Sequence, residues 1–129
     1  MLISPRRIGK TGLIHHVFEQ LKKSEPETKC FYMDINATRN VNQFIQLLAK
    51  TVVGQVDTFS QSAFRKILTL FSSYRPTVSF DEFTGIPTFS ITISQEQQEE
   101  SLKHIFDYLK QSGKRIYIAI DEFQQISEY

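Results

Sequence analysis

Hydrophobic residues along the chain follow two spacings in turn, one typical of helices and the other of strands. Between positions 13 and 21 they recur at helical intervals, which predicts a helix with one apolar face. The residues on that face are Leu13, Ile14, Val17, Phe18 and Leu21. Ser24-Glu25-Pro26 ends this helix, because proline does not continue it, and the apolar run at 29–35 then predicts a short buried strand.

Two further helices are predicted before the middle of the chain. One covers about residues 41–53, with Asn40 as its N-cap, because an asparagine side chain can accept a hydrogen bond from a free backbone N–H. The other covers residues 60–72. Its apolar positions are Phe64, Ile67, Leu68 and Phe71.

The segment that follows has the spacing of two strands around a turn. Val78 and Phe80 alternate with polar neighbours, and positions 89, 91 and 93 do the same after a turn at 84–87. This pattern predicts a β-hairpin inserted where a plain α/β fold would have only helix. We expect the hairpin's Phe80, Phe83 and Phe89 to pack into the core against the third helix, and a partner-binding surface is the alternative.

The clearest helix covers residues 94–113, with Ser94 and Gln97 at capping-box spacing and Gly113 at its end. Its expected buried stripe is Leu102, Ile105, Phe106 and Leu109. An apolar strand at 116–120 follows and ends in Asp121-Glu122. Strands separated by helices indicate an α/β fold with a mainly parallel sheet between helical layers.

Composition narrows the class of protein without naming a function. With 129 residues, 40% of them hydrophobic, the chain has material for one domain with its own core. Its net charge of +1 gives no bulk electrostatic attraction to nucleic acid or to an anionic membrane. The single cysteine, Cys30, excludes an internal disulfide, and the longest apolar run is far too short for a membrane span. We therefore expect a soluble cytoplasmic domain without membrane contact.

The segment at 4–14, SPRRIGKTGLI, has the ending of a phosphate-binding loop. Such a loop needs small residues where backbone N–H groups point inward, a lysine that reaches the β- and γ-phosphates, and a hydroxyl for Mg²⁺. Gly9, Lys10 and Thr11 supply these groups, and the helix that follows directs its positive end toward the anion. A plain helix start with a surface lysine is the alternative.

A second acidic motif lies near the other end of the chain. Asp121 and Glu122 follow a strand directly, and ligands of parallel sheets bind at the carboxyl ends of strands. An aspartate there can hold Mg²⁺, directly or through water, and the adjacent glutamate can activate an attacking water. Taken alone, the pair would be better explained as an ordinary solvated strand end, but its combination with the N-terminal loop favours a nucleotide site.

Together, SPRRIGKTGLI and RIYIAIDEFQQI resemble the Walker A and Walker B segments of archaeal-type ATPases in the AAA+/STAND group of P-loop NTPases. The resemblance covers nearly the whole chain and implies an ASCE-type three-layer fold that binds ATP with Mg²⁺. It places Lys10 on the phosphates, Thr11 and Asp121 at the metal, and Glu122 as the catalytic base. It also implies a nucleotide-binding loop made of Ser4, Pro5, Arg6, Arg7, Ile8, Gly9, Lys10, Thr11 and Gly12. Ser4 and Gly12 depart from the family pattern, which has glycine and commonly serine there.

The resemblance further implies that residues 1–129 form a partial ATPase domain, from Walker A to Walker B, without the sensor strand and the helical lid. We then expect hydrolysis only when missing segments or a partner complete the domain, for example by exchange of strands between two copies. Nucleic acid or an effector protein would act through further domains. The alternatives are a nucleotide-gated binding module without turnover, and a truncated gene product without activity of its own.

Other polar residues have plainer explanations. His15, His16 and His104 lack neighbours at metal-binding spacing and are expected to be structural or solvent-facing. Asp34 and Asn36 follow the second strand on the ligand side of the sheet, where turn formation is the favoured use and a site role the alternative.

Overall fold

The computed structural model describes residues 9–56, 65–66, 69, 71, 77–85, 87–90 and 92–129. Its elements are α1 (Lys10–Ser24), β1 (Lys29–Asp34), α2 (Val41–Val56), β2 (Thr77–Phe80), β3 (Pro87–Ser90), α4 (Gln95–Gln111), β4 (Ile116–Asp121) and the 3-10 helix η2 (Phe123–Glu128). Most of the helix expected at 60–72 lies outside the described residues.

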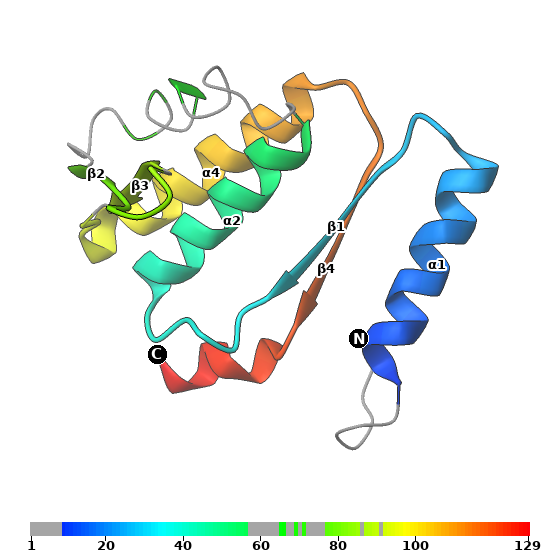
Figure 1. The fold of residues 1–129 in the computed structure, drawn as a ribbon, viewed down its shortest axis with the longest axis horizontal. Coiled ribbons are helices and arrows are strands. Elements are labelled where there is room, and N and C mark those ends of the chain that lie inside the picture. The colour runs from blue at the N-terminus through cyan, green and yellow to red at the C-terminus, as the bar shows by residue number, and fades with distance from the viewer. Residues whose placement is uncertain are drawn as a thin grey trace.

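Strands β1 and β4 lie side by side and run in the same direction (Figure 1). Their register pairs Lys29 with Ile116 at one end and Asp34 with Asp121 at the other. Both carboxyl ends therefore meet at one edge of the sheet. The predicted α/β arrangement with a parallel sheet is confirmed.

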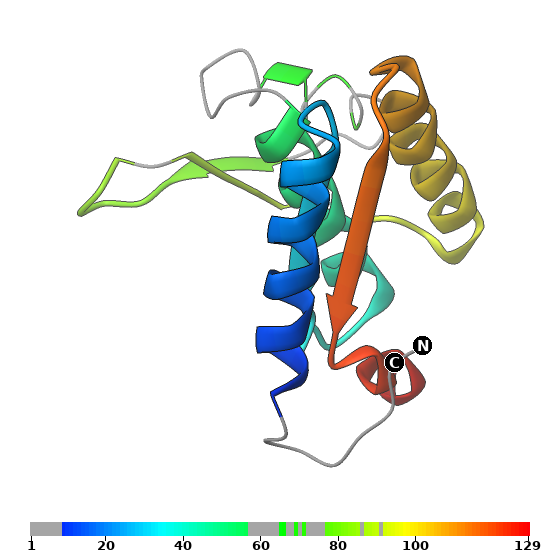
Figure 2. The same cartoon turned by 90° about the vertical axis from the view of Figure 1, so that its right-hand side faces the viewer.

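Helices cover both faces of this strand pair. Figures 1 and 2 show α1 on one face and α2 with α4 on the opposite face. Alternation along a strand sends Phe31 and Met33 toward α2, and both are buried. They belong to a cluster that also contains Ile45, Leu48, Val52, Ile105 and Leu109. The main core therefore lies between the sheet and α2 with α4.

The face of the sheet toward α1 is more polar. Tyr32, Asp34 and Asp121 occupy alternate positions on it, so α1 meets hydroxyl and carboxylate groups there. No side chain of α1 is fully buried, and Leu13 and Val17 are 49% and 45% exposed. Both residues belong to the predicted apolar face of this helix, and that face is therefore only partly covered.

Helix α4 begins with the predicted capping box, in which the Gln97 side chain accepts a hydrogen bond from the Ser94 backbone N–H at 3.1 Å. Its buried stripe is Ser101, Ile105 and Leu109, spaced four residues apart. Phe106 lies on the flank of this stripe and is 54% exposed, so its predicted burial is wrong.

Strands β2 and β3 pair antiparallel and project away from the rest of the molecule (Figure 2). Asp81 Oδ1 accepts hydrogen bonds from the backbone N–H groups of Phe83 (2.9 Å) and Thr84 (2.8 Å) and so orders the connecting loop. The loop turns Phe83 outward, leaving it 97% exposed, and Phe80 is 68% exposed. Their predicted core packing is wrong, and the side chain of Phe89 lies outside the description. That the pair is an insertion stays a prediction.

In the part of the chain that the structure describes, no helix is both long and apolar enough to cross a bilayer.

Candidate functional site

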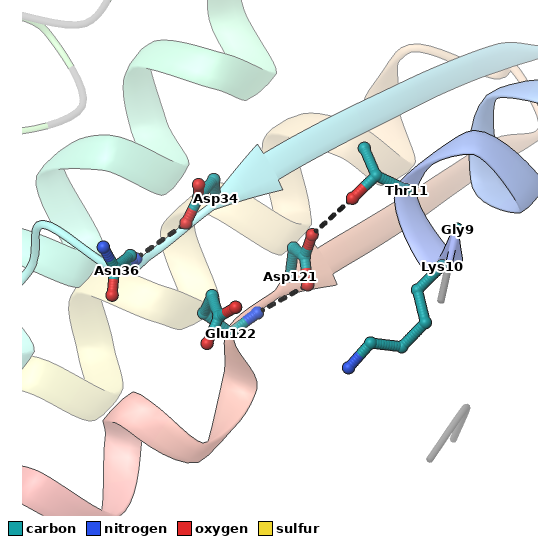
Figure 3. Close-up of a pocket in the computed structure, with 7 residues that line it drawn as sticks. All are labelled: Gly9, Lys10, Thr11, Asp34, Asn36, Asp121 and Glu122. Atoms are coloured by element: carbon teal, nitrogen blue, oxygen red, sulfur yellow. Dashed lines mark hydrogen bonds between the residues drawn. The ribbon is translucent and has the colours of Figure 1, made fainter. Parts of the chain in front are cut away.

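An open pocket of about 390 Å³ lies between the start of α1 and the carboxyl ends of β1 and β4 (Figure 3). The residues that line it are Gly9, Lys10, Thr11, Asp34, Asn36, Asp121 and Glu122. Polar and charged side chains dominate this set, and it mixes one cation with carboxylates. Such a lining suits a hydrated, charged ligand better than an apolar one.

At the start of α1, Gly9 precedes the helix in a left-handed conformation with φ 75°. A Cβ at this position would touch nothing within 4 Å, so the backbone angle alone favours glycine. The Gly9 carbonyl accepts the first helical hydrogen bond, from Leu13 N–H at 2.9 Å. Lys10 follows directly, and its side chain extends on the same side as Asp121 and Glu122 (Figure 3).

Asp121 ends β4 and accepts three hydrogen bonds from residues that the structure describes. Its Oδ2 accepts one from Thr11 Oγ1 at 3.0 Å and one from the Tyr32 hydroxyl at 2.6 Å. Its Oδ1 accepts the third from the Glu122 backbone N–H at 2.9 Å. The Tyr32 bond is the main cause that holds the pKa of Asp121 below its ordinary value; the Glu122 and Thr11 bonds and the Lys10 charge add to it, and partial burial opposes it. Asp121 is therefore ionised at neutral pH.

Glu122 has a left-handed backbone, with φ 58° and ψ 34°. Among the described residues it is the only non-glycine residue with positive φ. This conformation costs about 1–2 kcal/mol for a residue with a Cβ. It turns the chain sharply from β4 into η2, and the Glu122 carboxylate accepts a hydrogen bond from the Gln124 side-chain amide. Strain of this kind collects at functional sites.

The far end of η2 is also tied down. The Tyr129 hydroxyl is hydrogen-bonded to the Thr38 hydroxyl, and Thr38 itself donates to the Ile35 carbonyl at 2.6 Å. Ile35 and Thr38 belong to the loop that follows β1, and both are buried. The segment after Glu122 is therefore anchored to the loop that follows β1.

Asp34 and Asn36 form the turn that was the favoured prediction, and a site role for them stays a prediction. Asp34 Oδ1 accepts a hydrogen bond from the Asn36 backbone N–H at 2.9 Å, which orders the turn after β1. The same two residues line the cavity. Turn formation thus holds two polar side chains beside Glu122.

The structure brings five of the predicted site residues together around the cavity, namely Gly9, Lys10, Thr11, Asp121 and Glu122. Gly12 lies in the first turn of α1, exposed and outside the lining. The predicted loop residues Ser4, Pro5, Arg6, Arg7 and Ile8 lie outside the described residues. Sequence motifs missed Tyr32; its spacing two residues before Asp34 on the same strand face was the available signal.

Comparison with known proteins bears on what this cavity is for. An uncharacterised ATP-binding protein of Methanocaldococcus jannaschii is 25% identical over 138 residues, which covers 98% of this chain. The chain spans 37% of that protein's length. No solved structure matches the chain.

The KAP family P-loop domain matches residues 8–127, from the residue before Gly9 into η2. The match includes the Gly9-Lys10-Thr11 end of the first motif, the whole of the second motif, and every residue that lines the cavity. The prediction of a P-loop NTPase is thereby confirmed, and the AAA+/STAND assignment stays a prediction. The chain belongs to the KAP family of P-loop NTPase domains.

Proposed function

We propose that the chain binds ATP with Mg²⁺ in the cavity between α1 and the carboxyl edge of the β1–β4 sheet. The observation that carries the proposal is the convergence of Lys10 and Thr11 with Asp121, which lies 110 residues after Thr11 in the sequence. The choice of ATP is supported by the relative's name as an ATP-binding protein.

Each group has a role that follows from its chemistry. The first turn of α1 presents free backbone N–H groups and a positive dipole end to the phosphates, and Lys10 adds a full charge. The predicted loop residues 4–8 would supply the rest of this cradle. Glu122 stands beside Asp121 and is proposed as the base that activates water.

The residues also fit Mg²⁺. This ion prefers oxygen ligands and usually keeps several waters, with one or two carboxylates from the protein. Thr11 Oγ1 and Asp121 Oδ2 lie 3.0 Å apart, and Asp121 is kept ionised by its surroundings. When bound, the ion would neutralise charge on the phosphates. Thr11 and Asp121 are therefore the residues that would hold it.

We test binding with a fluorescent ATP analogue in the presence of Mg²⁺. Lys10→Ala is expected to weaken binding by at least about 10-fold, the size of one charge-assisted hydrogen bond. Lys22→Ala removes the same charge from the last turn of the same helix and is expected to leave the affinity unchanged. No binding by the wild-type chain at millimolar nucleotide would overturn the proposal, and so would equal affinities of wild type and Lys10→Ala.

Turnover is proposed to require completion of the domain, in the manner of the AAA+/STAND-type ATPases that the motifs resemble. Within the described residues, β4 pairs with β1 alone, and its second edge has no strand. A free edge beside Asp121 and Glu122 leaves them less firmly held than a strand inside a sheet. We infer that a strand from a longer chain or from a partner must pair with the second edge of β4 before Glu122 can activate water.

The test of this requirement is the steady-state ATPase rate of the chain alone, measured beside its Glu122→Gln variant. We expect binding without turnover from both. An ordinary ATPase rate that Glu122→Gln abolishes would show that the chain needs no completion. A binding module without turnover is the second candidate, supported if no added segment or partner restores hydrolysis.

A further inference from the structure

Tyr32 belongs to neither sequence motif and does not itself line the cavity, but it contacts Asp121, which does. Tyr32 lies on β1, and its hydroxyl donates to Asp121 Oδ2 at 2.6 Å, the shortest of the three bonds described for that carboxylate. We propose that Tyr32 is a positioning residue that holds the Asp121 carboxylate in the orientation needed for Mg²⁺. This inference rests on the proposed function of the site.

The three donors to Asp121 are not equivalent. Thr11 is itself a proposed metal ligand, so its hydroxyl is expected to turn from the carboxylate to the ion when the metal binds. The Glu122 N–H belongs to the adjacent peptide group and fixes Oδ1 only. Tyr32 is the side chain that restrains Oδ2 without competing for a place beside the ion. With it in place, the carboxylate keeps one orientation before and after the metal arrives.

Tyr32 is well placed to do this because its own position is fixed from two sides. Its backbone is opposite Ala119 in the parallel register, two residues before Asp121. Its ring packs against His15 of α1, with ring centroids 5.0 Å apart and planes tilted by 42°. His15 follows Thr11 by one helical turn, so the same helix positions both the hydroxyl ligand and the tyrosine ring.

Tyr32 reaches Asp121 from β1, and the first turn of α1, which forms the proposed phosphate cradle, takes no part in this hydrogen bond. Residues that orient a metal-binding group from outside typically change metal affinity by about 10–100-fold when they are removed. Loss of the Tyr32 hydroxyl is therefore expected to act on the metal and leave the phosphate cradle intact.

The experiment compares Tyr32→Phe with the matched variant Tyr117→Phe. Tyr117 lies on the same face of the sheet, opposite Cys30, and is not one of the residues described as donating to Asp121. A fluorescent ATP analogue is titrated once in EDTA and once at increasing Mg²⁺. For Tyr32→Phe we expect the half-saturating Mg²⁺ concentration to rise about 10-fold with unchanged affinity in EDTA. For Tyr117→Phe we expect neither value to change.

A double-mutant cycle with Asp121→Asn checks that Tyr32 acts through that residue. In the Asp121→Asn background, Tyr32→Phe is expected to have no further effect on the Mg²⁺ dependence. An additive effect would overturn the inference.

The other outcomes separate the inference from the proposed function. If the wild-type chain binds nucleotide equally with and without Mg²⁺, the proposed metal site itself fails. If wild type depends on Mg²⁺ and Tyr32→Phe keeps the same dependence, only the inference fails. If Tyr32→Phe weakens nucleotide binding equally in EDTA and in Mg²⁺, the Tyr32 side chain only packs. If Tyr32→Phe binds Mg²⁺ more tightly, the hydroxyl competes with the ion. Either result overturns the inference.

Discussion

At the scale of single residues, the backbone of Glu122 carries the clearest conflict between local preference and structure. A glutamate at φ 58° occupies a region that L residues with a Cβ rarely adopt. Two hydrogen bonds hold Glu122 in this conformation. Its backbone N–H donates to the Asp121 carboxylate, and its own carboxylate accepts from the Gln124 side-chain amide. The conformation points a carboxylate into the cavity at the place where β4 ends.

Replacing Glu122 isolates the cost of this conformation. Both Glu122→Gly and Glu122→Ala remove the carboxylate, but only alanine keeps the Cβ that disfavours positive φ. We expect Glu122→Gly to be more stable than Glu122→Ala by about 1 kcal/mol, measured as free energy of unfolding in urea. Equal stabilities, or a more stable Glu122→Ala, would show that the peptide relaxes out of the left-handed region.

At the scale of elements, the β2–β3 hairpin has a loop held by one carboxylate. Asp81 accepts from two backbone N–H groups, and the Gly85 N–H closes the loop onto the Asp81 carbonyl at 2.9 Å. The hydrogen bond from Thr84, and then that from Phe83, lower the pKa of Asp81 below its ordinary value of 3.8. The charged form is therefore the one that orders the loop.

The sign of the pH dependence follows from that direction. Because the folded pKa is the lower one, the contribution of Asp81 is complete above pH 3.8 and is lost as pH falls through the folded pKa. We expect hydrogen-exchange protection factors at Phe83 and Thr84 to decline below about pH 4 in the wild type. Asp81→Asn should show weaker protection without this decline, and the neighbouring Glu82→Gln should match wild type. A wild-type profile that stays flat in acid would contradict the role of the charge.

At the scale of the whole molecule, the two faces of the sheet differ in how much apolar surface they bury. The side toward α2 and α4 contains the cluster of Phe31, Ile45 and Ile105, all of them fully buried. The side toward α1 contains the polar cavity, and α1 buries no side chain completely. Stability should therefore be concentrated on one side of the sheet and ligand binding on the other.

Substitutions on the two sides should differ accordingly. Ile45→Ala opens a void in the cluster and is expected to cost about 2–5 kcal/mol of unfolding free energy. Leu13→Ala, which trims a half-exposed side chain, should cost about 1 kcal/mol or less. Urea denaturation of both variants measures the difference, and losses of the same size would mean that α1 is packed as firmly as α2.

The same asymmetry predicts the pattern of backbone exchange. We expect amides of α1 to exchange faster than those of α2 and α4, because fewer buried contacts oppose local opening of α1. Mg²⁺ with ATP should slow exchange in α1 selectively, since a ligand stabilises the conformation that it binds. Hydrogen exchange read by mass spectrometry tests both statements. Uniform exchange across the three helices would contradict the first, and equal slowing of all three the second.

Sequence patterns predicted what depends on short-range chemistry. Gly9-Lys10-Thr11 and Asp121-Glu122 were recognisable because a phosphate cradle and a strand-end acidic pair each need fixed residue types at fixed spacing. Tyr32 was not, because its role comes from the register of β1 on β4 and from the packing of α1, neither of which a local pattern encodes.

The spacing of hydrophobic residues was least informative about which side of a helix or hairpin packs against another element. Phe106 lies one position beyond the stripe that faces α2, and the Asp81 loop turns Phe83 into solvent. Leu13 and Val17 have helical spacing, but the sheet opposite them carries polar groups. For Phe106, Leu13 and Val17 the helical spacing was real, and distant parts of the chain decided which surface was available to cover them. For Phe83 a hydrogen bond to Asp81, two residues away, decided the outcome.

The contact between Thr11 and Asp121 has a consequence for synthesis of the protein. The helix with Lys10 is synthesised well before β4, and the two meet only after a loop of more than a hundred residues has closed. Under the proposed function, the nucleotide site is therefore incomplete until β4 has been synthesised and has paired with β1. ATP would then bind only a chain that has folded as far as β4, and would stabilise that fold.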